Sequence, residues 1–343
     1  MTQQTIYVDP AAGNDLASGS APSEARKTLV PKSNTTVVIL GTTPVVLKEP
    51  LDFSGLTNAV VQGADPTHPI TLIGEFIVKS WATTINCTLA NVTLTSASGR
   101  GTGGNIRGLK WSFLNVNMGH LGDALVYVGV NGLTIRGGQQ VGPIEGRCHY
   151  LYAVQNIDWD GGTFGPSGGE SPIRTSYPGV KGGTIKNVKV TQAGVPNKKA
   201  AWAIHAASDL HIDSCTADQA EFSFNSAGQG GATDKVTNCV VSNLTVNQSK
   251  LTLDANIAFD CTITNPTITN DTGEGISLVC APASGNSIVG GTVTTKGKHA
   301  VEFYNANDTK VSGVTLHYTT APAPVLDGAH VPANDAGGNV ACV

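Results

Sequence analysis

The sequence predicts an all-β fold, a right-handed, single-stranded parallel β-helix of about 12 stacked rungs with a short N-terminal capping segment. Three observations lead to this prediction. The composition favours short strands and tight turns, a short pattern repeats along most of the chain, and a second set of apolar strands recurs at the same period. Because each rung of such a fold packs only on its neighbours, 343 residues can form one repetitive domain.

The composition is rich in turn-forming residues and poor in charge. Gly accounts for 41 of 343 residues, and charged residues for 13%, against about 25% in an average soluble domain. Gly and Asn suit tight turns, whereas Thr and Val favour strands. The net charge of −4, with Lys and Arg spread thinly, argues against nucleic-acid binding. No apolar run is long enough to cross a membrane, so we expect no membrane insertion.

A six-residue pattern recurs in ten copies with a mean period of about 25 residues. It consists of an apolar residue, any residue, then Asn, Gly or Ser, two more residues and a closing apolar residue. Thr precedes the closing residue in eight of the ten copies. The ten turn positions are Asn91, Asn115, Gly132, Gly161, Asn187, Ser214, Asn243, Asn265, Gly290 and Gly313.

Each copy reads as a strand, a turn and a second strand. The apolar residues face inward, the turn residue tolerates a left-handed or bridge backbone conformation, and Thr faces outward. The rest of each period supplies a third strand and a variable loop, which predicts a coil of three sheets with parallel pairing between rungs. Three earlier segments, Thr36–Leu40, Ala59–Gln62 and Ile70–Leu72, resemble further rungs.

We expect three regions along the chain. Residues 1–30 form an N-terminal strand and capping helix, residues 31–318 the β-helix, and residues 319–343 an irregular C-terminal cap or tail. The tail contains Pro322, Pro324, Pro332 and a Gly-Gly pair. Solenoid ends need a cap, because an open terminal rung invites pairing with another edge. The first ten residues, MTQQTIYVDP, lack the charged and apolar regions of a signal peptide.

The seven cysteines show neither a CxxC pair nor a Cys–His cluster, so we expect no metal site and no cofactor. Most should be small buried residues. Cys239 and Cys261 each lie two residues before the first apolar position of consecutive copies, so their side chains should stack in the core. They are either free thiols or a disulfide.

Residues Ile6–Leu29 read IYVDPAAGNDLASGSAPSEARKTL: a strand, Gly-Asn-Asp, a Gly, a Pro and a short helix that ends in Thr-Leu. This segment resembles the cap of the pectate-lyase-like β-helix superfamily, which includes polysaccharide lyases, related epimerases and phage tailspikes. The resemblance implies the fold and only weakly a function. The catalytic signatures of the superfamily's hydrolases and epimerases are missing, and the paired Lys and Arg of its lyases cannot be placed.

The strands that precede each repeat form a second column whose outward positions make a candidate site. Side chains two residues apart share a face, and rungs are about 4.8 Å apart. We therefore expect one stripe of four outward side chains: Tyr152, Arg174, His205 and Asn225. The candidate catalytic residues are His205, Arg174 and Tyr152, and the candidate substrate-binding residues are Tyr150, Tyr152, Tyr177, Asn225 and Asp254.

The chemistry of these residues suits glycans. Arg or His can meet an acidic glycan or exchange protons, and Tyr rings can stack on sugars. Hydrolysis would instead need two carboxylates about 5 to 9 Å apart. Three interpretations of this face stay open: an active site, a binding surface, or an ordinary polar surface without a ligand.

The predicted function is that of a phage virion surface protein, of the tailspike, fibre or decoration type, that recognises host polysaccharide and, in a stronger version of the hypothesis, degrades it. Three competing hypotheses are a purely structural virion decoration, a secreted polysaccharide lyase or hydrolase, and a bacterial adhesin. The expected partners are polysaccharide or other virion proteins, with a homotrimer if the protein is a spike. The expected location is the virion surface, with an extracellular location as the second hypothesis.

Overall fold

The computed structural model describes residues 3–79, 83–97, 102–196, 199–224, 235–254, 257–271, 275–281, 285–296, 301–306, 309–318, 326–327 and 340–342. Within these ranges the chain is a parallel β-solenoid of about ten turns, so the predicted fold class is confirmed and the predicted count of about 12 rungs is slightly too high. The chain divides into two compact units: unit 1 comprises Met1–Tyr150 and Val154–Thr163, and unit 2 comprises Leu151–Ala153 and Phe164–Val343.

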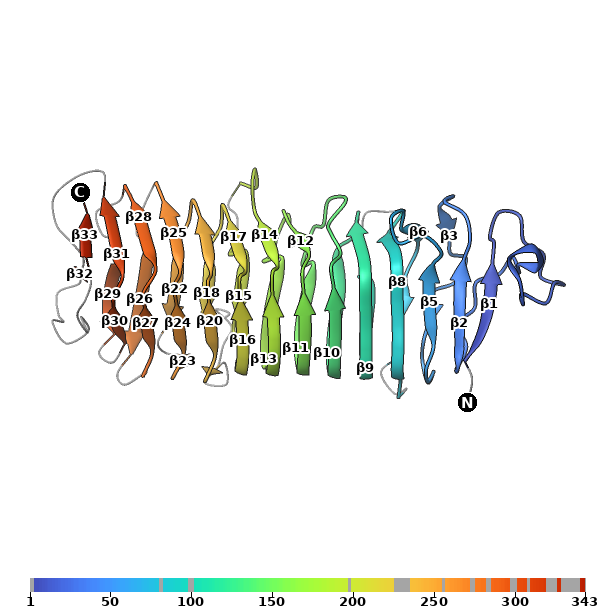
Figure 1. Cartoon of the computed structure of the whole chain (residues 1–343), viewed down its shortest axis with the longest axis horizontal. Helices are drawn as coiled ribbons and strands as arrows, with labels where there is room; N and C mark the ends of the chain where they lie inside the picture. Colours follow the sequence, from blue (N-terminus) through green and yellow to red (C-terminus); the bar gives the residue numbers. More distant parts are fainter. Residues whose placement is uncertain are drawn as a thin grey trace. The chain divides into compact units, whose positions relative to one another are not determined.

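Unit 1 is a stack of rungs whose main strands pair in parallel, each with the next one along the chain (Figure 1). The strands of this series are β1 (Gln4–Val8), β2 (Thr35–Ile39), β5 (Val60–Gly63), β8 (Ile85–Thr95), β9 (Thr102–Gly119) and β10 (Asp123–Arg136). Shorter strands fill the other side of the early rungs: β3 (Val45–Val46), β4 (Leu51–Asp52), β6 (Ile70–Ile73) and β7 (Phe76–Ile77). Strand β11 (His149–Asp160) contributes residues to both units.

The N-terminal segment contains β1 and, where a capping helix was predicted, a single 3-10 turn, η1 (Pro22–Glu24). Within the described ranges this is the only helical element. The local sequence explains why a short turn forms here instead of a longer helix. The hydroxyls of Ser18 and Ser20 both donate to the Glu24 carboxylate, and these hydrogen bonds hold the segment in a tight turn. Of the predicted C-terminal tail, only 326–327 and 340–342 lie within the described residues.

Unit 2 contains three rows of parallel strands. Row A begins with the first residues of β13 (Ile173–Lys186) and continues through β15 (Trp202–Ile204), β18 (Phe222–Phe224), β22 (Leu251–Asp254), β26 (Ile276–Ala281), β29 (Val301–Ala306) and β32 (Leu326–Asp327).

Row B begins with the last residues of β13 and continues through β16 (Ala207–Asp213), β20 (Val240–Ser242), β24 (Thr262–Thr264), β27 (Ser287–Val289) and β30 (Lys310–Ser312). Row C consists of β14 (Lys189–Thr191), β17 (Thr216–Asp218), β21 (Thr245–Asn247), β25 (Thr267–Asn270), β28 (Thr292–Thr295), β31 (Thr315–Tyr318) and β33 (Val340–Cys342). The predicted arrangement of two strands around each repeat turn corresponds to rows B and C.

The turn positions of the repeat follow the prediction. All ten have the left-handed backbone conformation, with φ between 51° and 79°. Asn is favoured where glycine is absent because its short polar side chain tolerates this region and can bond to a neighbour. A similar turn column in unit 1 forms a ladder, in which the Asn58 amide donates to Asn34 at 2.9 Å and the Asn86 amide donates to Asn58 at 2.8 Å.

The core of unit 1 is an aromatic stack. Phe53, Phe76, Trp111 and Phe113 are at most 1% exposed, and the rings of Phe53 and Trp111 lie 5.2 Å apart. The stack continues to Tyr127, whose hydroxyl shares a 3.1 Å hydrogen bond with Nδ1 of His149. Burial lowers the pKa of His149 to about 3, because the charged imidazolium would lose its solvation.

Candidate functional site

Row A of unit 2 carries the candidate site, and its register agrees with the alignment made from the sequence. Ile173 pairs with Trp202, Trp202 with Phe222, and Phe222 with Leu251. All four side chains are completely buried. The residues that follow them point to the opposite face of the sheet. Because the strands are in register, they form one line across four rungs, the outer row: Arg174, Ala203, Ser223 and Thr252.

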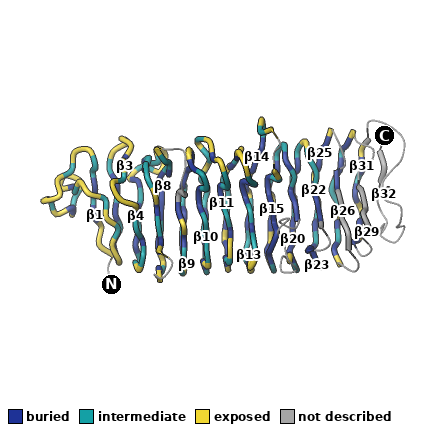
Figure 2. The backbone as a smooth tube through the Cα atoms, turned by 180° about the vertical axis from the view of Figure 1, so that it is seen from behind, coloured by how far each residue is buried: buried dark blue, intermediate teal, exposed yellow. Residues whose placement is uncertain are grey.

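The outer row is buried as well. Ala203 is 4% exposed, Ser223 0% and Thr252 7%, so β15 and β18 are buried along their whole length (Figure 2). Neither Oγ of Ser223 nor Oγ1 of Thr252 has a hydrogen-bond partner among the described residues. An unsatisfied buried hydroxyl costs roughly 1–3 kcal/mol. The row therefore keeps hydrogen-bonding capacity that the described part of the chain does not use.

Arg174 begins the outer row and is the charged member of it. Its side chain is only 20% exposed, and Nη1 forms an ion pair with Oε2 of Glu170 at 2.6 Å. Its Nε is buried and has no hydrogen-bond partner within the described residues. The Nη1 end of the guanidinium is thus engaged, whereas the buried Nε–H makes no hydrogen bond within the described residues.

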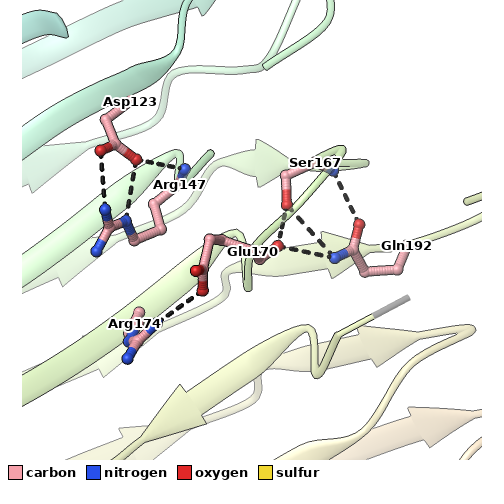
Figure 3. Close-up of polar contacts among 6 residues, drawn as sticks. All are labelled: Asp123, Arg147, Ser167, Glu170, Arg174 and Gln192. Atoms are coloured by element: carbon pink, nitrogen blue, oxygen red, sulfur yellow. Dashed lines mark hydrogen bonds and ion pairs between the residues drawn. The ribbon is translucent and has the colours of Figure 1, made fainter. Parts of the chain in front are cut away.

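A buried polar cluster fixes the position of Glu170 (Figure 3). Gln192, which follows β14, is completely buried; its Oε1 accepts from the Ser167 backbone N–H at 2.8 Å, and its Nε2 donates to the Glu170 carbonyl at 3.2 Å. The Ser167 hydroxyl donates to the same carbonyl. The turn from Ser167 to Glu170 is therefore tied to row C through its backbone, and the Glu170 carboxylate is left to face Arg174.

His205 is not part of this row, and its side chain is buried where the sequence predicted an exposed one. Strand β15 ends at Ile204, so the alternation of faces no longer holds at the next residue. The backbone N–H groups of His205 and Ala206 both donate to Oγ1 of Thr175, each at 3.1 Å. The chain bends there, and the His205 side chain is only 5% exposed.

The predicted tyrosines fall in two places. Tyr152 and Tyr177 belong to unit 2 and are 37% and 52% exposed. Tyr177 lies three residues after Arg174 on β13. Tyr150 belongs to unit 1, where the Arg147 guanidinium lies 4.2 Å from the centre of its ring. Asn225 lies outside the described residues, and Asp254 ends β22 with its side chain outside them.

Sequence reasoning missed Glu170, Ser223 and Thr252. A signal for two of them was present: each outward residue of row A between Arg174 and Thr252 is small, although the inward residues beside it are large. Ser277 continues the same register position on β26. Such a run of small polar residues on a strand face leaves room for close approach of another group.

Unit 1 contains a second partly buried ion pair, between Asp123 and Arg147 (Figure 3). Nε and Nη2 of Arg147 donate to the two carboxylate oxygens, each at 2.9 Å, and the Arg147 backbone N–H donates to Oδ1 at 2.8 Å. This bidentate geometry uses the fork fully. Among the described residues there is no group of three or more His, Cys, Asp or Glu side chains that could hold a metal ion.

Two solved structures share this fold over most of the chain. One is the catalytic unit of the thermostable GH87 alpha-1,3-glucanase from Streptomyces thermodiastaticus strain HF3-3, with a TM-score of 0.62, 14% identity, and coverage of 90% of this chain and 63% of that one. The other is the catalytic domain of a GH87 alpha-1,3-glucanase D1068A in complex with tetrasaccharides, with a TM-score of 0.62, 10% identity, and coverage of 99% and 69%. The chain thus spans less than two thirds of the first protein's length.

A third structure, bacteriophage CBA120 tailspike protein 3, gives a TM-score of 0.33 at 12% identity and covers 98% of this chain and 61% of that one. No family model matches the chain, and no curated protein matches its sequence. The predicted resemblance to polysaccharide-active β-helix proteins is confirmed at the level of fold. Within the described ranges, no helix is long and apolar enough to span a membrane.

Proposed function

We propose that unit 2 binds a polysaccharide along the outer row, and that binding uncovers the row, since Ser223 and Thr252 are buried in the free protein. The observation that carries this proposal is the alignment, on one strand face, of buried polar groups without a described partner: Nε of Arg174, Oγ of Ser223 and Oγ1 of Thr252. In native proteins such groups are rare, and a ligand or ordered water commonly satisfies them. Sugar hydroxyls both donate and accept hydrogen bonds, so they complement Ser, Thr and an Arg N–H.

The spacing of the row suits a chain-like ligand. Successive rungs are about 4.8 Å apart, so a ligand that lies across the strands meets a new side chain at each rung. This advance is similar to the length of one sugar unit in a glycan. Arg174 and Thr252 are three rungs apart, which corresponds to a bound segment of a few sugars. The ring of Tyr177, three residues after Arg174 on β13, is exposed and gives the ligand a separate apolar surface against which a sugar can pack.

The charge of the site favours a neutral glycan. The Glu170 carboxylate balances the Arg174 guanidinium, and the other two polar members of the row are hydroxyls. A uronate or sulfate would meet the Glu170 carboxylate as well as the arginine. Binding is favoured over cleavage, because Glu170, the carboxylate held against the row, is engaged by Arg174 rather than free for acid or base work.

At the level of the whole protein, we infer a glycan-recognising surface protein. The shared fold with two polysaccharide-active enzymes supports the ligand class. We place the protein on the surface of a phage virion, as a tailspike, fibre or decoration and as a homotrimer if it is a spike; an extracellular location without a virion is the competing hypothesis. Light scattering of the purified chain tests the trimer, and antibody labelling of virions tests the location.

The binding experiment uses a panel of neutral and acidic polysaccharides, with affinity measured by calorimetry. We expect a neutral polymer to bind and the double variant Ser223→Ala/Thr252→Val to bind at least tenfold more weakly, because each lost hydrogen bond is worth about 1 kcal/mol. Thr267→Val is the matched control, since Thr267 is an exposed threonine of row C in the same unit. Wild-type affinity in the double variant would show that the row is not the site.

The same incubations detect cleavage. New reducing ends would reveal a hydrolase, and unsaturated uronate, detected by its ultraviolet absorbance, would reveal a lyase. Binding without either product is the expected result. A chain that neither binds nor cleaves any polymer of the panel, but is present on virions, would instead be a structural decoration.

A further inference from the structure

Two buried cysteines of unit 2 occupy equivalent positions in adjacent rungs. Cys239 and Cys261 are each 1% exposed and each immediately precede a strand of row B. Val240 pairs with Thr262 one residue later, and the Thr262 N–H donates to the Cys239 carbonyl at 2.9 Å. The two cysteines are therefore in register, with their side chains on the inner face of the solenoid.

Their pairing is unambiguous within this column. The register places Leu210 before Cys239 and Asn286 after Cys261, so each thiol has one cysteine as a neighbour. The Cys239 thiol donates to the Thr237 carbonyl and the Cys261 thiol to the Phe259 carbonyl, each at 3.4 Å. The proximity of the two thiols lowers the pKa of Cys239 and raises that of Cys261. Adjacent parallel strands bring Cα atoms about 4.8 Å apart, inside the range of about 4.4–6.8 Å that a disulfide spans.

We propose that Cys239 and Cys261 are an oxidation site that forms a disulfide between two consecutive rungs of unit 2. The structure contains both residues as free thiols at equivalent positions beside two paired strands, so closure requires only small changes of side-chain torsion and rung spacing. The bond would join strands that are already paired, and it would close the loop of chain between them. It thereby restricts the unfolded chain more than the folded one.

The oxidant is a low-molecular-weight disulfide. Cys239 loses its proton and attacks one sulfur of the oxidant, which releases one small thiol and leaves a mixed disulfide. Cys261 then loses its proton, attacks the Cys239 sulfur and releases the second small thiol. The two protein thiols are oxidised by two electrons, and the small disulfide is reduced to two thiols. Because both sulfurs are buried, this exchange belongs to folding, before the rungs close over them.

The test refolds the full chain in a mixture of oxidised and reduced glutathione, then quenches it with acid, alkylates the remaining thiols under denaturing conditions and maps the peptides by mass spectrometry. We expect a peptide cross-linked between Cys239 and Cys261, with Cys87 and Cys215 alkylated. The oxidised chain should also unfold at a higher temperature than the reduced chain by several degrees, a shift that a reductant reverses.

Two variants separate the disulfide from a packing effect. Cys239→Ala/Cys261→Ala should show no redox-dependent shift of the unfolding temperature, whereas Cys215→Ala should keep the full shift. Cys215 is a suitable control because it is equally buried, in a different column beside Val188 and Leu244. Complete alkylation of both cysteines after oxidative refolding, or a cross-link to any other cysteine, would overturn the proposal.

Discussion

Arg147 in unit 1 and Arg174 in unit 2 are almost equally buried, with side chains 22% and 20% exposed, yet their surroundings differ (Figure 3). Arg147 binds both oxygens of Asp123 and lies over the ring of Tyr150. Arg174 makes one ion pair, to Glu170, and its buried Nε has no described partner. Arg147 is therefore held by a bidentate ion pair, whereas Arg174 makes one ion pair and has a buried N–H without a described hydrogen bond.

Nearby residues extend the contrast. In unit 1, the buried His149 shares its Nδ1 with the Tyr127 hydroxyl inside the aromatic core. In unit 2, the buried hydroxyls of Ser223 and Thr252 follow Arg174 along the outer row without described partners. In the proposal made above, the polar groups of the outer row serve a ligand.

The largest expected effect concerns His149 and acid. Its folded pKa of about 3 lies below the usual value of 6.5, so between these two pH values the unfolded chain binds a proton that the folded chain does not. The stability contribution is therefore present above pH 6.5 and is lost as the pH falls toward 3, by up to about 5 kcal/mol at 1.36 kcal/mol per pH unit. Urea unfolding between pH 4 and 7 measures it.

The variant His149→Phe, alone and with Tyr127→Phe, is the control for this titration. Each should flatten the dependence of unfolding free energy on pH by about one proton over this range. If the dependence of unfolding free energy on pH is unchanged in the variants, His149 titrates alike in the folded and unfolded states. That result would contradict a buried, neutral imidazole at this position.

The next largest effect separates the two arginines. Arg147→Met leaves the Asp123 carboxylate without its partner and should lower the unfolding free energy by about 2–4 kcal/mol, somewhat less than for a fully buried pair. Arg174→Met should cost less than about 1 kcal/mol, because it removes a single contact to a half-exposed carboxylate. Chemical denaturation of both variants measures the two losses of unfolding free energy. Glycan binding should show the opposite order: Arg174→Met should weaken the affinity, and Arg147→Met should leave it unchanged. Equal stability losses would contradict the contrast.

A matched pair of buried threonines in unit 2 tests the outer row more finely. Thr175→Val removes the acceptor of two backbone N–H groups and should destabilise the chain by roughly 1–3 kcal/mol. Thr252→Val removes a hydroxyl that has no described partner, so the unfolding free energy should stay the same or rise. Thermal unfolding of the two variants side by side measures the difference. A large loss in Thr252→Val would reveal an internal partner for that hydroxyl.

The smallest expected effect is on Glu170. Glu170→Gln keeps the backbone contacts to Ser167 and Gln192 and removes only the negative charge. Stability should change by less than about 1 kcal/mol, since this carboxylate is 41% exposed. Affinity for a neutral glycan should change little, and affinity for an acidic glycan should increase because Arg174 is no longer neutralised. If the variant binds acidic polymers no better than wild type does, Arg174 does not face the ligand.

The repeat could be read from the sequence because its chemistry is local. Asn, Gly and Ser mark left-handed turns through their own backbone preferences, and all ten predicted turns adopt that conformation. Alternation along short strands then gave the inward residues and register of row A, such as Trp202 opposite Phe222. The prediction for the His205 side chain failed because the alternation of faces ends with the strand. The bend after Ile204 depends on Thr175, a residue of the previous rung.

The sequence by itself therefore determined the solenoid, its turns and the inward columns, since each follows from the preferences of residues close together in the chain. Only the tertiary structure decided which polar groups are satisfied and which are left over. Gln192 holds the Glu170 turn from 22 residues away, and that turn engages one side of Arg174. Hydrogen-bond satisfaction depends on such distant neighbours, and so the outer row could be recognised only after the chain was folded.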